Sequence, residues 1–356
     1  MITSMRHVLI CRTDNLGDVV LTLPLAGYLR QLFPALKIGF LCRSYAAAVV
    51  AQSAAIDYVV ERETLGSSLD DAVQWMRAAQ IDTIIFAKPD RRLGAAAKKA
   101  GIAQRVGTSH RWFHWMYCNR LAHFSRVKSS LHEAQLNFAL LQPLGIDTVP
   151  PVSAIAPLYR MRRPDAAMAS PRDASVAGQF DPGRFNLILH PKSNGNGREW
   201  PVDHFVALAG MLSAEPEILL WITGSETEGA WLATHAPALL QQPNVRNLCG
   251  SLSLGQLTAR IGAADGLVAS GTGPVHIAAA MGQRTLGLYP PLKPIHPGRW
   301  APIGLRAQTL SRPGSCNGCA DLADCACMRS ITPQTVAHIV LGWQVEARMS
   351  PQTKSQ

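Results

Sequence analysis

Short apolar runs alternate with helical patterns along both halves of the chain, and this alternation constrains the fold more than any other feature. In the first half, runs of buried-strand type are separated by segments whose apolar residues recur with the period of a helix. We predict strands at residues 7–11, 37–41, 58–60 and 83–86, and helices at residues 20–32, 69–79 and 92–100. Pro24 is expected to bend the first turn of the first helix. This alternation favours a parallel, doubly wound α/β sheet.

The same alternation restarts after a proline-rich stretch around residues 150–183, whose composition is typical of a linker. We predict strands at residues 185–190, 218–223, 267–269 and 285–288, and helices at residues 202–212, 226–235 and 273–281. The expected organisation is an N-terminal Rossmann-like domain (1–160), a linker (161–182), a second Rossmann-like domain (183–332) and a helix (333–348) that packs back across the domains. Two such domains leave a crevice at the carboxyl ends of both sheets, where ligands bind in open α/β folds.

The composition argues against several classes of protein. The chain of 356 residues is 47% hydrophobic and 16% charged, which argues against disorder. The apolar stretch within residues 1–11 is too short for a signal peptide, and later apolar runs are interrupted well before the length of about 18 residues that spans a membrane. We therefore expect a soluble, cytoplasmic protein whose eight cysteines are reduced thiols rather than a disulfide framework.

The first loop that carries chemistry follows the first predicted strand. Residues 15–20 read Asn-Leu-Gly-Asp-Val-Val, in which Gly17 permits a tight turn and Asp18 falls at the start of the next helix. A carboxylate at this position can stabilise the helix terminus. It can also point into the crevice and take a proton from an acceptor hydroxyl. The position alone does not decide between the two interpretations.

A second loop, at residues 191–201, follows the first predicted strand of the second half. It contains two glycines and ends at Pro201, which suits the first position of a helix. A glycine-rich loop that opens a helix presents backbone N–H groups to a phosphate. Lys192 and Arg198 are then placed to neutralise a diphosphate. The alternative interpretation is a flexible turn.

A third loop, at residues 270–276, again offers small residues at the start of a helix, where an anion can approach closely. Glu226 follows the second strand of the same half, and it is either a ribose-binding acid or a plain first-turn helix acid. A nicotinamide oxidoreductase is disfavoured because the first loop has no G-x-G-x-x-G pattern. In addition, Arg43 rather than an acid follows the second strand.

Together these loops resemble glycosyltransferase family 9, the bacterial lipopolysaccharide heptosyltransferases. Four segments occur in the family's order and span nearly the whole chain: RTDNLGDVVLTLP (12–24), HPKSNGNGREWP (190–201), TGSE (223–226) and TGPVHIAAA (272–280). The resemblance implies a GT-B fold with two Rossmann-like domains facing a central cleft, an inverting transfer and no required metal. The sequence agrees on the metal, because it has no Asp-x-Asp motif to hold Mg²⁺ or Mn²⁺ on a diphosphate.

The resemblance also implies roles for individual residues. The family's proposed base maps onto Asp18, the contact to the donor diphosphate onto Arg198, and the acid that holds the donor ribose onto Glu226. The complete expected donor-binding set is Lys192, Ser193, Arg198, Glu226, Thr272, Gly273 and His276. One position departs from the family, because Gly271 replaces the usual Asp before Thr-Gly. Either Ser270 partly substitutes for the missing carboxylate or the donor sugar differs from heptose.

The net charge of +10 is concentrated in residues 88–128, which contain ten Lys or Arg and a single acid. Trp112 and Trp115 lie among these bases. Such a surface can stack on nucleic-acid bases, bind an anionic membrane or remain a solvated face. Given the resemblance, we expect it to dock a phosphorylated glycolipid at the inner leaflet rather than nucleic acid. The candidate acceptor-binding residues are Arg12, Asn15, Arg111 and Arg120.

Four cysteines lie close together near the end of the chain, at Cys316, Cys319, Cys325 and Cys327. Four thiolates can bind zinc. The Cys-x-Cys pair is tighter than ordinary structural zinc spacing, so reduced or oxidisable thiols are the alternative.

We therefore predict a metal-independent, inverting glycosyltransferase that uses ADP-heptose as co-substrate and has no other cofactor. The expected acceptor is lipopolysaccharide core or a related glycolipid, reached in the cytoplasm or at the inner face of the inner membrane. The alternatives are a transferase of the same fold with another nucleotide-sugar donor and a basic α/β protein that binds nucleic acid.

Overall fold

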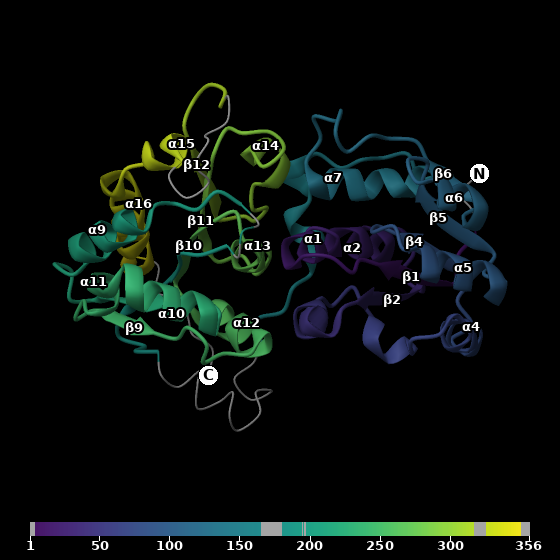
Figure 1. The fold of residues 1–356 in the computed structure, drawn as a ribbon, viewed down its shortest axis with the longest axis horizontal. Coiled ribbons are helices and arrows are strands. Elements are labelled where there is room, and N and C mark those ends of the chain that lie inside the picture. The colour runs from purple at the N-terminus through teal and green to yellow at the C-terminus, as the bar shows by residue number, and fades with distance from the viewer. Residues whose placement is uncertain (1–3, 165–179, 194, 196, 317–324, 350–356) are drawn as a thin grey trace. The chain divides into compact units, whose positions relative to one another are not determined.

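The structure, a computed structural model, describes residues 4–164, 180–193, 195, 197–316 and 325–349 (Figure 1). The chain forms two compact units, residues 1–162 and residues 163–356. Each unit contains one sheet of parallel strands covered by helices.

The first unit is built on a six-stranded sheet with the order β3-β2-β1-β4-β5-β6. Its strands are β1 (His7–Cys11), β2 (Lys37–Cys42), β3 (Tyr58–Glu61), β4 (Thr83–Phe86), β5 (Gln104–Thr108) and β6 (Arg120–Ala122). The central strand β1 pairs in parallel with β2 and β4, so that Val8 lies opposite Ile38 on one side and Thr83 on the other. All five residues of β1 are buried, as a continuous apolar run predicts for the centre of a parallel sheet.

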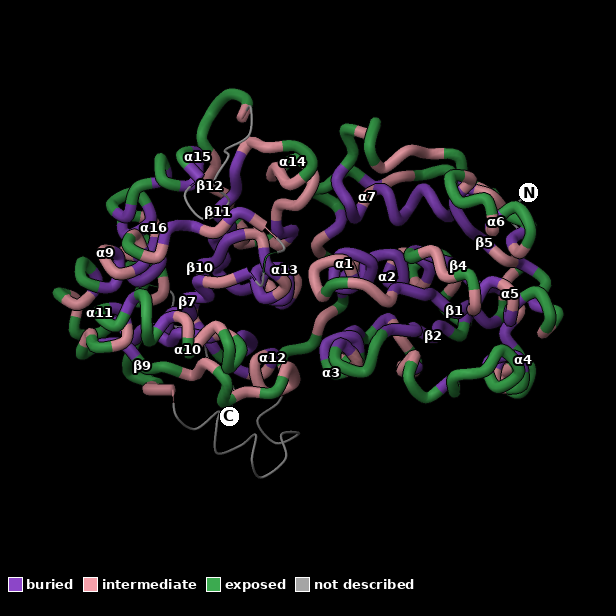
Figure 2. The backbone as a smooth tube through the Cα atoms, in the orientation of Figure 1, coloured by how far each residue is buried: buried purple, intermediate pink, exposed green. Residues whose placement is uncertain are grey.

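Helices cover this first sheet: α1 (Leu16–Val20), α2 (Leu23–Leu32), α3 (Ala47–Val50), α4 (Leu69–Ala78), α5 (Arg91–Ala100), α6 (Trp112–Tyr117) and α7 (Glu133–Phe138). Alternate residues of each strand point to opposite faces. Leu9 and Cys11 pack in one cluster with the buried residues of α4 and α5, such as Val73 and Leu93. Buried residues therefore follow the strands and the inner faces of the helices (Figure 2).

The second unit repeats this topology with the order β12-β11-β10-β7-β8-β9. Its strands are β7 (Phe185–His190), β8 (Ile218–Ile222), β9 (Val245–Asn247), β10 (Gly266–Ser270), β11 (Arg284–Tyr289) and β12 (Ala307–Ser311). Its helices are α9 (Val202–Leu212), α10 (Glu226–His235), α11 (Pro237–Leu240), α12 (Leu254–Ala263), α13 (Gly273–Ala280), α14 (Pro297–Trp300), α15 (Ala326–Arg329) and α16 (Pro333–Met349). Read from the edge strand β9, the sheet has the Rossmann strand order, as the first sheet does.

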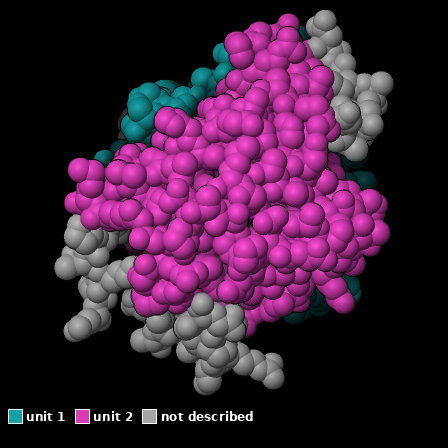
Figure 3. Space-filling model, turned by 90° about the vertical axis from the view of Figure 1, so that its left-hand side faces the viewer, with its two compact units in different colours: residues 1–162 teal, residues 163–356 magenta. Residues whose placement is uncertain are grey.

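The long final helix α16 packs against α9 in the second unit. Its residues Val336, Val340 and Trp343 are buried in a cluster with Leu187 of β7 and Phe205 of α9. The two units divide between Arg162 and Arg163 (Figure 3). Residues 165–179 of the predicted linker lie outside the described residues.

The predicted doubly wound fold is confirmed, and two local expectations need correction. The single helix predicted at residues 20–32 is divided between two helices: α1 ends at Val20, and α2 begins at Leu23 with Pro24 in its first turn. The i→i−4 hydrogen bonds of α1 end at Leu21, because the N–H of Thr22 donates to the carbonyl of Val19. Four strands were not predicted: β5, β6, β9 and β12. Each is short or interrupted by polar residues, so it lacks the apolar run of a central strand. Among the described residues, no helix has both the length and the apolar character needed to cross a membrane.

Candidate active site

The three loops singled out in the sequence follow strands at the carboxyl edges of the two sheets. In the first unit the strand order reverses between β1 and β4, and in the second between β7 and β10. The loops at residues 12–15, 191–201 and 271–272 follow β1, β7 and β10. Ligands of open α/β sheets bind at such reversal points.

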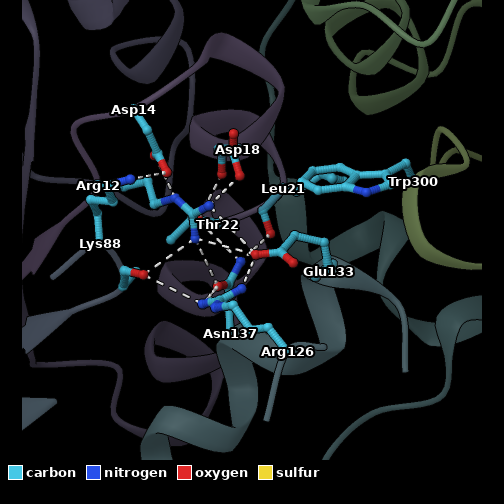
Figure 4. Close-up of polar contacts among 12 residues, drawn as sticks. Arg12, Asp14, Asp18, Leu21, Thr22, Lys88, Arg126, Glu133, Asn137 and Trp300 are labelled. Carbon is cyan, nitrogen blue, oxygen red and sulfur yellow. Dashed lines mark hydrogen bonds and ion pairs between the residues drawn. The ribbon is translucent and has the colours of Figure 1, made fainter. Parts of the chain in front are cut away.

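Asp18 lies on α1 with its side chain only 13% exposed, and it is bound by a buried arginine. Nη2 of Arg12 donates to Oδ1 of Asp18, while Nε of Arg12 donates to Asp14 at 2.7 Å (Figure 4). The N-cap position of α1 is Asn15. Asp18 is therefore an acid of the first turn and not the N-cap residue, and the pairing with Arg12 holds its carboxylate in place.

A third carboxylate, that of Glu133, also contacts the same arginine. Oε1 of Glu133, the first residue of α7, lies 3.4 Å from Nη1 of Arg12 and also accepts from Nη1 of Arg126 (Figure 4). The Glu133 side chain is almost fully buried. We call Arg12, Asp14, Asp18, Arg126 and Glu133 the Asp18 cluster. It sets three carboxylates against two guanidinium groups, and Nζ of Lys88 lies 3.6 Å from Oδ2 of Asp14. Each charge of the cluster therefore has a partner of opposite sign, as low-dielectric surroundings require.

Asn137 fixes the backbone around this cluster. Its amide nitrogen donates to the carbonyl oxygen of Leu21 and to Oγ1 of Thr22, each at 3.1 Å. Oγ1 of Thr22 in turn donates to the backbone carbonyl of Asp18 at 2.8 Å. These bonds tie α7 to the break between α1 and α2, which explains why the chain can interrupt the helix there without leaving buried polar groups unsatisfied.

The surroundings of Asp18 raise the pKa of its carboxyl group above the ordinary value. Burial is the largest cause, because it disfavours the charged form, and the negative charge of Asp14 acts in the same direction. The charge of Arg12 and its hydrogen bond oppose the shift. A carboxylate with a raised pKa is a stronger base than a solvated aspartate, which suits it to accept a proton from a hydroxyl group.

The predicted acceptor-binding residues occupy different positions. Arg12 is buried, and its contacts are to the Asp18 cluster itself. Asn15 is exposed beside Asp18 on the same turn. Arg111 is the exposed N-cap residue of α6, and Arg120 is exposed at the start of β6. Within the described residues, no hydrogen bond or ion pair joins either arginine to the Asp18 cluster.

In the second unit, Glu199 closes the loop after β7. Its carboxylate accepts from the backbone N–H of Ser193 at 2.7 Å and from the Ser193 hydroxyl at 3.0 Å. It also pairs with the ammonium group of Lys192, which lies 3.8 Å from the ring centroid of Trp231 on α10. The charge of Lys192 is therefore held against the protein by an ion pair and a cation–π contact.

The loops after β7 and β10 lie against each other. The backbone N–H of Trp200 donates to Oγ of Ser270 at 2.8 Å. A Cβ atom placed on Gly197 would lie 3.3 Å from the carbonyl oxygen of Gly271. Thr272, the N-cap residue of α13, is buried, and its hydroxyl has no hydrogen-bond partner within the part of the chain described. A buried hydroxyl beside the N-terminus of a helix is suited to bind an anion that approaches the N–H groups of that helix.

The remaining donor-site candidates surround these loops. Arg198 and His276 are buried. Gly273 is the first residue of α13. Glu226 is exposed at the start of α10, where Ser225 and Glu228 form the capping box. Because the capping bonds are made by those neighbours, the Glu226 carboxylate is not used to cap its own helix.

Gly271, the position that departs from the family pattern, lies against an aromatic ring. A Cβ atom at Gly271 would lie 2.7 Å from Cε1 of Tyr289, and one at Gly287 would lie 2.7 Å from Cε2 of the same ring. Tyr289 is buried, and its hydroxyl donates to the carbonyl of Trp300 at 2.7 Å. The ring thus occupies the space into which a side chain at residue 271 would have to extend.

The cysteine cluster is only partly described, because Cys319 lies outside the described residues. Cys325 and Cys327 are buried, and Cys316 is intermediate. Burial and the neighbouring Cys316 raise the pKa of the Cys327 thiol, in that order of importance. No group of three or more ligand-type side chains suited to a metal occurs among the residues that the structure describes.

Several residues of these sites were not predicted. Glu133, Arg126 and Asn137 belong to the Asp18 cluster but lie more than 100 residues from Arg12 in sequence. The only sequence signal was an isolated glutamate at the start of an apolar helix. In the second unit, Trp231 and Tyr289 were also missed, because no local spacing connects them to the loops that they contact.

Comparison with known proteins gives consistent matches. A family model described as glycosyltransferase family 9 (heptosyltransferase) matches residues 121–325. A Haemophilus influenzae protein described as a glycosyltransferase is 26% identical over 303 residues, which cover 84% of this chain and 86% of that protein. Lipopolysaccharide core heptosyltransferase OpsX of the same organism is 21% identical over 292 residues, covering 80% and 79% respectively.

The fold is also similar to that of a solved enzyme. The structure of Escherichia coli ADP-heptose lipopolysaccharide heptosyltransferase II superposes with a TM-score of 0.71 at 16% identity. The match covers 97% of this chain and 100% of that one. At this level of identity the likeness concerns the fold, with its two parallel six-stranded sheets.

Proposed function

The chain belongs to glycosyltransferase family 9, the heptosyltransferase family, and has the GT-B fold, and we propose its reaction from this membership. We propose that the enzyme transfers heptose from ADP-heptose to a glycolipid acceptor and inverts the configuration at the anomeric carbon. The family model covers more than half of the chain, so the protein is a heptosyltransferase-like glycosyltransferase. The donor, the acceptor, the stereochemistry and the residues that act are proposals. The observation that carries the proposed reaction is the buried Asp18 carboxylate held by Arg12, while the donor and acceptor are proposed from the similar heptosyltransferases.

In the proposed reaction, Asp18 removes the proton from an acceptor hydroxyl bound by the first unit. The oxygen then attacks the anomeric carbon from the face opposite ADP, and the bond between that carbon and the phosphate oxygen breaks. Arg12 is a positioning residue, because its buried guanidinium holds the Asp18 carboxylate while itself being anchored by Glu133. General-base assistance of this kind contributes roughly 10²- to 10⁴-fold to a rate.

The second unit is proposed to bind the donor and stabilise the departing ADP. The Thr272 hydroxyl and the N–H groups at the start of α13, beginning with Gly273, face negative charge favourably. Arg198 and Lys192 supply positive charge to the diphosphate, with His276 and Ser193 beside it. Glu226 is free of capping bonds and is proposed to hold the ribose. These groups stabilise the leaving group without a metal ion, in keeping with a sequence that has no Asp-x-Asp motif.

The acceptor is proposed to be lipopolysaccharide core or a related phosphorylated glycolipid, since OpsX is a lipopolysaccharide core heptosyltransferase. Asn15, Arg111 and Arg120 are candidates to contact it. The protein is proposed to act in the cytoplasm, peripherally at the inner face of the inner membrane. One observation favours the alternative that the donor is another nucleotide sugar. The Tyr289 ring lies against Gly271, just after β10, at the position where the family carries a carboxylate.

A thermal-shift screen with ADP, UDP and GDP and their sugars tests the donor. We expect stabilisation by ADP and a larger one by ADP-heptose, with transfer retained in EDTA. Stabilisation by UDP or GDP but not ADP would overturn the donor assignment. NMR of the product tests the stereochemistry, because inversion requires the new glycosidic bond to have the anomeric configuration opposite to that of the donor.

A further inference from the structure

Helix α6 of the first unit has an unusual exposed face. Trp112 and Trp115 are 62% and 61% exposed, and Met116 is 50% exposed. These positions are spaced i, i+3 and i+4, so the three side chains lie on one side of the helix. His114, in contrast, is fully buried. The helix therefore buries an imidazole and exposes two indoles and a thioether, the reverse of an ordinary surface helix.

Single exposed apolar residues are common on proteins, but a group of large ones marks a contact surface. Tryptophan is enriched at membrane–water interfaces, where its ring meets the headgroup region and its N–H finds a polar partner. Here the indole N–H of Trp115 already donates to the carbonyl of Ser109 at 2.9 Å. Burying that ring in an apolar layer would therefore leave no indole donor unsatisfied.

Positive charge surrounds the three apolar side chains. The guanidinium of Arg91 lies 5.2 Å from the ring centroid of Trp112, and Nζ of Lys98 donates to the carbonyl of Met116 at 2.9 Å. Arg111 directly precedes α6, and Arg120 follows it at the start of β6. Helices α5 and α6 lie side by side in the first unit (Figure 1).

These cations lack partners of opposite charge in the described residues. Nearby Arg62 and Lys99 pair with Asp90 and Asp70. No described carboxylate lies within 4.0 Å of a charged nitrogen of Arg91, Lys98, Arg111 or Arg120. We call these four cations, together with Trp112, Trp115 and Met116, the α6 face. It offers uncompensated positive charge next to exposed aromatic rings.

We propose that the α6 face binds the surface of a membrane that contains anionic phospholipid. This inference deepens the proposed function, because it rests on a lipid-linked acceptor and identifies the surface that brings the protein to it. The positions of Trp112 and Asp18 in the first unit are consistent with this proposal. Trp112 follows β5 and Asp18 follows β1, so both lie beyond the carboxyl ends of strands in one parallel sheet. The chain also runs from α6 through β6 to Arg126, a member of the Asp18 cluster.

Single-stranded nucleic acid is the other polyanion that aromatic and basic residues recognise, through stacking of bases on ring faces. The structure favours the membrane. The guanidinium of Arg91 lies over one face of Trp112 and competes with a base for it. Trp112, Trp115 and Met116 are nevertheless at least half exposed, and insertion between lipid headgroups needs such accessible apolar side chains.

The test is co-sedimentation of the full chain with vesicles of phosphatidylcholine alone or with added phosphatidylglycerol. We expect binding only to the anionic vesicles, and its loss between about 0.1 M and 1 M salt. A Trp112→Ala/Trp115→Ala variant should bind at least about tenfold more weakly. A Lys98→Gln variant should lose about fivefold. Leu305→Ala, which truncates an exposed apolar residue of the second unit, should bind as the wild type does.

Two outcomes would overturn the proposal. In the first, the wild type and the double tryptophan variant bind anionic vesicles equally well, and their urea unfolding curves match. In the second, the protein binds an RNA oligonucleotide but does not bind vesicles. The thermal shift with ADP separates this proposal from the proposed function. The double variant should retain that shift, and Asp18→Asn should bind vesicles normally while losing transfer. If Asp18→Asn remains active while vesicle binding still depends on the α6 face, the assignment of Asp18 as the base is wrong and the membrane proposal stands.

Discussion

Arg12 binds the carboxylate of Asp18 at a position where both side chains are largely removed from solvent. The pair is not isolated, since the same guanidinium also contacts Asp14 and Glu133. Burial raises the pKa of Asp18 and Arg12 opposes that effect, so the basicity of the carboxylate is set by competition between desolvation and pairing. An arginine shared among three carboxylates neutralises each of them only partly. This arrangement keeps Asp18 fixed in position and yet able to accept a proton.

Replacing Asp18 by Asn should remove the base without removing its shape. We expect the rate of transfer to fall by roughly 10²- to 10⁴-fold while donor binding is retained, because the donor is proposed to bind the second unit. Steady-state transfer assays together with the thermal shift by ADP measure the two effects. Asp70→Asn is a matched control, since Asp70 is an exposed acid of the same unit that pairs with Lys99. Retained turnover in Asp18→Asn would exclude the base assignment.

The pH dependence of transfer should report the raised pKa of Asp18. The base acts only when ionised, so the rate should fall as the pH drops through a value above the ordinary aspartate pKa of 3.8. Asp14→Asn removes a negative charge that raises this pKa and keeps an oxygen that can accept from Arg12. The acid limb of kcat/KM should therefore move to lower pH in this variant. A limb that stays in place, or moves to higher pH, would contradict the assignment of that limb to Asp18.

The parts of the fold that could be predicted are those in which local pattern and tertiary environment agree. Strands β1, β4 and β7 are continuous apolar runs at the centres of parallel sheets, and their bounds were predicted to the residue. Strand β5, Gln-Arg-Val-Gly-Thr, was missed because only one of its residues is a large apolar side chain. It is a strand because β4 and β6 supply its hydrogen-bond partners. The periodicity of a single segment does not show which other strands lie beside it.

The candidate sites show the same division. The strand–loop–helix order was enough to bring the loops to the carboxyl edges of the sheets. The partners of individual side chains could not be predicted in this way. That Lys192 faces a phosphate stays a prediction, but its ion pair with Glu199 and its contact with Trp231 were not predicted. The tryptophan lies on a helix that begins after another strand. Such pairings depend on packing between elements distant in sequence.

Glu133→Gln should destabilise the first unit. Glu133 is the almost fully buried carboxylate that Arg12 and Arg126 share. Removing its charge breaks the ion pair with Arg126 and takes away one of the carboxylates that anchor Arg12. Breaking a buried pair in this way costs about 3 kcal/mol. Urea unfolding measures the change in the free energy of unfolding. Glu63→Gln serves as the control, because the pair between Glu63 and Arg43 is half-exposed and should contribute less than about 1 kcal/mol. Equal effects of the two substitutions would show that Glu133 has no special role in the cluster.

Gly271→Ala should be destabilising because of Tyr289. The new Cβ atom would lie 2.7 Å from Cε1 of a buried ring whose hydroxyl is bonded to the Trp300 carbonyl, so the ring cannot move away easily. Overpacking of this kind costs about 1–3 kcal/mol. Gly342→Ala, on helix α16, is a control with the opposite expected sign, since a Cβ atom there meets nothing within 4 Å. We expect this substitution to raise the free energy of unfolding by about 0.5–1 kcal/mol.

A double-mutant cycle identifies the ring as the cause of the Gly271 effect. Tyr289→Ala removes the obstacle, so adding Gly271→Ala to it should cost much less than in the wild type, although Tyr289→Ala is itself destabilising. An unchanged cost in the Tyr289→Ala background would mean that the backbone, and not the ring, requires glycine. If the cost does disappear, residue 271 is a glycine because Tyr289 fills the space of a side chain. The donor-sugar preference should then be sought by varying both positions together, since a carboxylate at residue 271 can be accommodated only when the ring is reduced.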